Sequence, residues 1–248
     1  MSGSLAIIRV TLRQLLGGKR LIVLGILGLL PAVVIWLSTA NRSATAAFQN
    51  YHEIAIVILF MIVLPLTALV LGSATLGDER RDGTLSFLLV RPLRRSSIAG
   101  AKLLAAWIAA AGVTVIAGTI ASATVSARTS DWSTLVPTIV GMALASACYA
   151  AVFMVLGHLT SRAVLAGLVY IFIWESGISF AAPSLANVSL FRIGLTAYTG
   201  LLPESTRLLS EPLGSLSPGV GGALAKTLGI GLVAVLAAAS LLKRRDTT

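Results

Sequence analysis

The sequence is poor in charged residues and in cysteine. Charged residues make up 11% of its 248 residues, well below the roughly 25% of soluble domains, whereas hydrophobic residues make up 56%. Too few polar side chains remain to cover a soluble surface, so the composition indicates an integral membrane protein. The single cysteine, Cys148, excludes a disulfide within the chain and a zinc site built on cysteines.

The sequence also lacks the motifs of an enzyme. It contains no phosphate-binding Gly-x-x-x-x-Gly-Lys-Ser/Thr motif and no cluster of histidines with carboxylates. We therefore expect no catalytic residues, no metal site and no bound cofactor on this chain. The net charge of +10 does not predict nucleic-acid binding, because the basic residues flank apolar runs instead of gathering on a soluble face.

Six apolar runs are long enough to span a bilayer, which takes about 20 helical residues. They lie near residues 21–39, 54–76, 101–125, 134–158, 163–181 and 220–242. Before them, Leu5, Ile8, Leu12 and Leu15 recur at helical spacing, which predicts an amphipathic helix in the membrane interface. The predicted fold is therefore an all-α membrane bundle of six transmembrane helices with an interfacial N-terminal helix.

Lysines and arginines are unevenly divided between the two sides of this predicted bundle. Of the 19 basic residues, 14 fall on one side and the other five are Arg42, Arg128, Arg192, Arg207 and Lys226. The positive-inside rule makes the richer side cytoplasmic, and six spans place both termini there. Small residues at spacing four, Gly118 with Ser122 and Gly141 with Ala145, predict close helix packing.

The stretch from Asp78 to Lys102 is the charge-dense segment between two apolar runs. Asp82 is a candidate helix cap, the leucines after it share one helical face, and Pro92 ends that predicted helix. Ser96 is the candidate cap of the next span. The pattern favours a short helix along the cytoplasmic membrane surface over a basic loop that binds lipid headgroups.

The string ERRDGTLSFLLVRPLRRSSIAGAK in this stretch resembles the signature of ABC-2 type ABC transporter permeases. The matching residues are Glu79, Gly83, Thr84, Leu85, Leu88, Leu89, Pro92, Arg95, Gly100 and Lys102. The string YIFIWE at 170–175 also resembles a feature of the fifth span in some bacterial members.

The resemblance implies that residues 79–92 form a coupling helix that docks on a separate ATPase subunit. It implies an exporter of two permease chains, identical or paralogous, and two ATPases, which bind ATP and Mg²⁺, in the bacterial plasma membrane. The implied ATPase contacts are Glu79, Arg80, Arg81, Asp82, Gly83, Thr84, Leu85, Leu88, Leu89, Arg91 and Pro92. The whole chain, 1–248, is then one permease domain with an interfacial helix (1–20), a coupling segment (77–100) and an outer loop with short helices (182–219).

Two charged residues lie in apolar surroundings near the outer side. Glu175 falls in the outer half of the fifth predicted span, and Lys226 enters the sixth span from outside. The two can form a structural pair, or Glu175 can belong to a gate or substrate path, because intramembrane charges are often functional. His52 and Glu53 are predicted to lie in the outer interface.

Other function classes have less support in the sequence. A secondary transporter or channel usually carries several intramembrane ionisable groups or paired broken helices, and no clear internal repeat is visible. A non-transporting membrane scaffold is compatible with the composition. The sequence does not identify a substrate.

Overall fold

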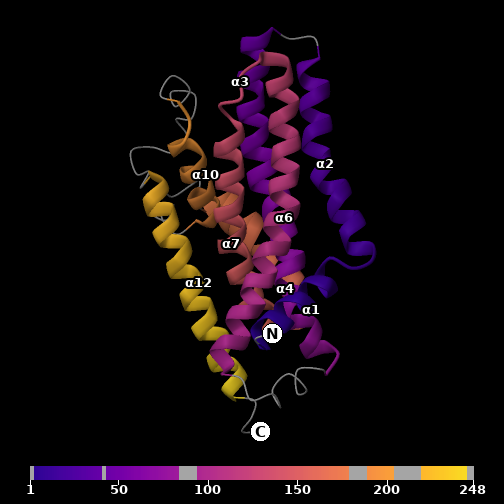
Figure 1. Cartoon of the computed structure of the whole chain (residues 1–248), viewed down its shortest axis with the longest axis vertical. Coiled ribbons are helices and arrows are strands. Elements are labelled where there is room, and N and C mark those ends of the chain that lie inside the picture. Colours follow the sequence, from indigo (N-terminus) through magenta and orange to yellow (C-terminus); the bar gives the residue numbers. More distant parts are fainter. Residues whose placement is uncertain (1–2, 41–42, 84–93, 179–188, 204–218, 245–248) are drawn as a thin grey trace.

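The computed structural model describes residues 3–40, 43–83, 94–178, 189–203 and 219–244, and its regular elements in these ranges are all helices. They form an elongated bundle in which α1 and the end of α12 lie at one end and α3 lies at the other (Figure 1). We call these the α1 end and the α3 end. The elements are α1 (Gly3–Leu15), α2 (Lys19–Thr39), α3 (Ala44–Ile54), η1 (Ala55–Val63), α4 (Leu64–Arg81), α6 (Arg95–Thr129), α7 (Leu135–Leu159), α8 (Ala163–Val169), η2 (Tyr170–Ile178), α10 (Leu190–Gly200) and α12 (Gly219–Arg244).

Five helical stretches in the described residues are long and apolar enough to cross a membrane. They are Lys19–Thr39, Ala44–Arg81, Arg95–Thr129, Leu135–Leu159 and Gly219–Lys243. Of the six predicted spans, the fifth corresponds only to a shorter apolar helix, Ala163–Glu175. The predicted limits of the second and third spans, 54–76 and 101–125, are too narrow, because these helices continue through polar residues that the apolar pattern does not include.

The second of these helices runs from α3 through η1 into α4 without a break. The element η1 has π-helical hydrogen bonds, and the backbone N–H of Leu64 donates to the carbonyl oxygen of Leu59, five residues back. Pro65 follows directly and has no N–H to donate, and its ring clashes with a carbonyl four residues back in a regular helix. The wider turn before Pro65 makes room for the ring, so the chain stays helical over 38 residues.

Small residues bring the central helices together, as the predicted pairs indicate. A Cβ atom added to Gly118 of α6 lies 2.8 Å from Cγ2 of Thr138 in α7. The Ser122 hydroxyl shares a 2.8 Å hydrogen bond with Thr134 at the same interface. On another face of α7, a Cβ on Gly141 lies 3.0 Å from the carbonyl oxygen of Gly194 in α10. The core therefore lies around α7, which contacts α4, α6, α10 and α12.

The N-terminal helix α1 packs on α6 through a face that shares only Leu15 with the predicted apolar stripe. Its buried residues are Ile7, Thr11 and Leu15, whereas Leu5 is 54% exposed. The prediction concerned the stripe that faces the acyl chains, not the face that packs on α6. In a membrane protein an apolar side chain is equally stable against lipid, so hydrophobicity does not identify the buried face.

Candidate functional site

The candidate site lies at the α1 end, where α4 ends and α6 begins. Of the predicted ATPase contacts, Thr84, Leu85, Leu88, Leu89, Arg91 and Pro92 lie outside the described residues, so the coupling helix stays a prediction. The structure does describe Asp78 to Gly83 and the first turns of α6. These residues connect the predicted coupling segment to the bundle.

The two predicted helix caps in this region are wrong. Asp82 has helical dihedral angles (φ −83°, ψ −2°) and ends α4, because its N–H donates to the carbonyl oxygen of Asp78 at 2.8 Å. An N-cap residue normally has an extended backbone. Gly83 follows with φ +69°, the left-handed conformation that commonly ends a helix at glycine. Ser96 lies inside α6, which starts at Arg95 after an extended Arg94.

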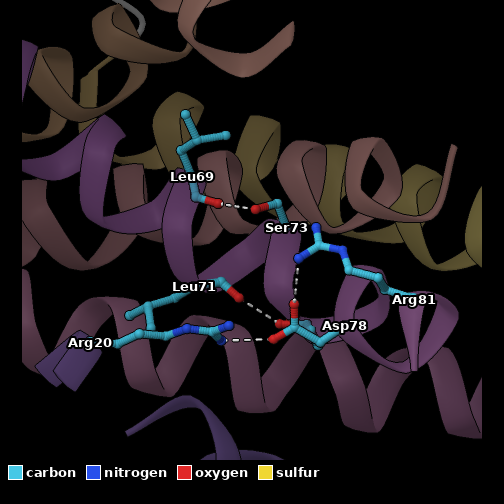
Figure 2. Close-up of polar contacts among 7 residues, drawn as sticks. Arg20, Leu69, Leu71, Ser73, Asp78 and Arg81 are labelled. Atoms are coloured by element: carbon cyan, nitrogen blue, oxygen red, sulfur yellow. Dashed lines mark hydrogen bonds and ion pairs between the residues drawn. The ribbon is translucent and has the colours of Figure 1, made fainter. Parts of the chain in front are cut away.

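Three consecutive residues in the last turn of α4 bind three different helices. Asp78 pairs with Arg20 of α2 at 2.7 Å (Figure 2). Glu79 pairs with Lys102 of α6. Arg80 donates from Nη1 to the carbonyl oxygen of His158 in α7 at 2.7 Å. Successive residues of a helix point about 100° apart, which is why three adjacent side chains reach three neighbours. We call Asp78, Glu79 and Arg80 the α4 end cluster.

The contacts of this cluster differ in burial and therefore in strength. The Lys102 side chain is only 1% exposed and that of Glu79 is 13% exposed, so each needs the other to offset its loss of hydration. The Arg20 and Asp78 side chains are 41% and 31% exposed, and such pairs contribute about 0–1 kcal/mol. Arg81 approaches Asp78 from another side at 3.9 Å (Figure 2) and contributes less still. The Glu79–Lys102 pair is therefore the main polar link.

A close crossing of α4 and α7 lies next to the cluster. A Cβ atom on Gly157 of α7 lies 2.2 Å from the carbonyl oxygen of Ser73 in α4. A Cβ on Gly77 lies 3.2 Å from the carbonyl oxygen of Gly157. The two backbones are thus in direct contact, which allows Arg80 to reach the end of α7.

Glu175 occupies a second polar site, deep in the bundle. Its side chain is buried, with 2% of the residue exposed. Oε1 accepts hydrogen bonds from the Tyr170 hydroxyl and from the backbone N–H of Leu190, both at 2.8 Å. Oε2 accepts one from the Ser189 hydroxyl. Its predicted pairing with Lys226 stays a prediction. Within the described residues, no group of three or more histidine, cysteine or acidic side chains is placed to hold a metal ion.

The comparison with family models decides what kind of protein this is. The model of the ABC-2 family transporter protein matches residues 18–177, more than half of the chain. The chain belongs to the ABC-2 transporter family. The comparison with curated proteins gives no match.

Family membership confirms the resemblance drawn from residues 79–102 and makes the chain a transmembrane transporter permease. Permeases of the ABC-2 family are not themselves catalytic. The matched range contains both the α4 end cluster and Glu175.

The sequence missed one buried polar group of this ABC-2 permease. His52, predicted to lie in the interface, is only 5% exposed, and its Nδ1 lies 2.7 Å from the Tyr198 hydroxyl in a hydrogen bond. Tyr51 beside it is fully buried and bonded to the Thr138 hydroxyl at 3.0 Å. The prediction failed because α3 extends the helix of the second span beyond its apolar run, and α10 packs against this extension. The adjacent aromatic pair Tyr51–His52 ahead of an apolar run is the one signal that pointed to burial.

Proposed function

We propose that this chain is the transmembrane permease subunit of an ATP-driven exporter, and that the segment around residues 79–92 receives movement from a separate ATPase subunit. The working complex has two permease chains and two ATPases, and ATP and Mg²⁺ bind to the ATPases. The chain crosses a bacterial plasma membrane six times with both termini in the cytoplasm. Membership of the ABC-2 family is the observation that carries this proposal.

The α4 end cluster supports the proposal because it joins the predicted coupling segment to the rest of the bundle. The segment leaves α4 at Gly83 and returns at Arg94. Glu79, in the last turn of α4 before the segment, and Lys102, in the first turns of α6 after it, connect α4 to α6. Asp78 and Arg80 extend these contacts to α2 and α7.

These contacts determine how a displacement of the segment spreads. A push on the end of α4 cannot move that helix alone, because its last turn is bonded to α2, α6 and α7 and its backbone touches that of α7 at Gly157. The four helices therefore move together when the ATPases close. In the proposed mechanism this joint movement changes the side of the membrane to which the translocation path is open.

The test is a reconstitution of the permease with a stand-alone ATPase encoded beside it. Leu85→Asp places a charge on the predicted apolar face of the coupling helix, and we expect it to weaken the complex by about tenfold or more, as for a central interface residue. The measurements are co-purification and the ATPase activity that the permease stimulates. Leu85→Met is the matched control, because it keeps an apolar side chain of similar volume.

Gly83→Pro is a second, independent variant. Proline fixes φ near −65°, whereas Gly83 has φ +69°, so the variant redirects the chain as it leaves α4. We expect intact permease with little stimulated ATPase activity. Normal complex formation and normal stimulation in both Leu85→Asp and Gly83→Pro would rule out the coupling assignment.

A further inference from the structure

Helix α10 is a short buried helix that does not span the bundle. Its 11 residues extend about 16 Å, and Leu190, Phe191, Ile193, Leu195, Ala197 and Tyr198 are all buried. It lies between α7 and α12 and also contacts η1 (Figure 1). A helix that begins inside protein needs partners for the backbone N–H groups of its first turn, because no preceding turn supplies carbonyl oxygens to accept them.

Glu175 supplies such a partner at the start of α10. Its carboxylate accepts the N–H of Leu190, the first residue of the helix, and the hydroxyl of Ser189, the residue before it. The Ser189 hydroxyl in turn accepts the N–H of Arg192 at 3.3 Å. A negative charge is favourable at this position, because the first N–H groups give a helix a partial positive charge at its N-terminus. The Tyr170 hydroxyl donates to the same carboxylate and fixes its orientation.

His52 holds the other end of α10. Its Nδ1 is hydrogen-bonded to the hydroxyl of Tyr198, two residues before the helix ends. Phe48 packs against the His52 ring edge-on at 4.8 Å, and Phe60 packs against Tyr198 at 5.4 Å. The two ends of α10 are therefore bonded to different helices, one end to Glu175 in η2 and the other to His52 in α3.

The sides of α10 are packed unequally. On one side Gly194 touches α7, where an added Cβ lies 2.5 Å from the Cβ of Ala145. On another side Leu190 and Ile193 line an apolar cavity of about 760 Å³ that α7, Tyr170 and α12 complete. Among the described residues, α10 is thus packed closely on α7 but borders an apolar cavity on another side, so the bonds at its two ends carry more of its attachment.

We propose that Glu175 and His52 are positioning residues that keep α10 inside the bundle, and that loss of either contact releases this helix while the spanning helices stay folded. Glu175 thus acts through the backbone of α10 as a fixed, charged helix cap. The inference concerns the permease alone and does not depend on the ATPase proposal.

The test measures how readily a cysteine in α10 reacts. Cys148 is the one native cysteine, so Cys148→Ala gives a background on which a single reporter is introduced. The reporter is Thr196→Cys, at a position in α10 that is 4% exposed. The control reporter is Ala121→Cys, which is fully buried in α6. The rate of modification by N-ethylmaleimide is measured for each in detergent-solubilised permease.

Glu175→Gln keeps the shape of the side chain but removes its charge, and Tyr198→Phe removes only the hydroxyl that meets His52. We expect each to speed the modification of Thr196→Cys by about tenfold, the effect of losing one buried or charge-assisted hydrogen bond. We expect the rate at Ala121→Cys to stay within about twofold.

Two results would overturn the proposal. An unchanged rate at Thr196→Cys in both variants would show that neither contact holds α10. An equal rise at both reporters would show that the variants loosen the whole bundle. Because Tyr198→Phe is a minimal change, it keeps the test valid if Glu175→Gln fails to fold.

Discussion

Replacing Lys102 by methionine tests whether its contact with Glu79 holds α4 against α6. Methionine keeps most of the apolar stem of lysine and removes the ammonium group. Because the Lys102 side chain is 1% exposed and that of Glu79 is 13% exposed, the variant leaves a carboxylate largely out of water without this cation. Removing one member of a buried ion pair costs roughly 3–5 kcal/mol. At about 2–4 °C per kcal/mol for a chain of this size, we expect Tm to fall by about 6–20 °C.

The assay is a double-mutant cycle of Lys102→Met and Glu79→Gln, in which Tm is measured for the purified permease in detergent. Removing both charges leaves no unpaired ion. The double variant should therefore lose about 1–3 kcal/mol less stability than the sum of the losses of the two single variants. The Arg20–Asp78 pair supplies the control cycle. Its side chains are 41% and 31% exposed, and its coupling should stay below about 1 kcal/mol and weaken with salt. Strictly additive losses at Lys102 and Glu79 would refute the reasoning.

Two further substitutions test the packing of α7. Gly157→Ala places a Cβ 2.2 Å from the carbonyl oxygen of Ser73 and should separate α4 from α7 at a cost of about 3 kcal/mol or more. The control is Gly112→Ala, which has no atom within 4 Å of its Cβ and should leave Tm unchanged or raise it. Similar losses of Tm in both variants would contradict this account. Tyr51→Phe removes the hydroxyl that is hydrogen-bonded to Thr138 and should lower the free energy of unfolding by about 0.5–1.5 kcal/mol. The loss should be seen as a lower Tm with unchanged helical circular dichroism. An unchanged Tm would show that this hydrogen bond contributes nothing to stability.

Apolar runs and small residues made the helices of this fold predictable. Long apolar segments locate the spans because backbone groups in lipid must be paired within a helix. Within the segment predicted to carry short helices, 182–219, the structure has the helix α10 over Leu190–Gly200. Gly118 and Gly141 lie at close contacts for a local reason, since a missing side chain is visible in the sequence itself.

The partners of the charged residues were not predictable. Asp78, Glu79 and Arg80 form one charged run in sequence, and nothing local says that they turn to α2, α6 and α7. Their partners Arg20, Lys102 and His158 lie 58, 23 and 78 positions away in the sequence, respectively. The role of Glu175 was undetermined for the same reason, because its partners Ser189 and Leu190 follow a segment whose path the sequence does not define.

We expect the Glu79–Lys102 pair also to affect how the chain enters the membrane during synthesis. An unpaired charge in an inserting helix is unfavourable by up to about 2.5–3.5 kcal/mol, depending on its depth. Glu79 emerges from the ribosome 23 residues before Lys102, so α4 is complete while its counter-charge has not yet been made. Insertion of α4 and α6 as a hairpin, after both have emerged, lets the two charges enter as a neutral unit. The order of synthesis thus favours paired insertion of these two helices over insertion one by one.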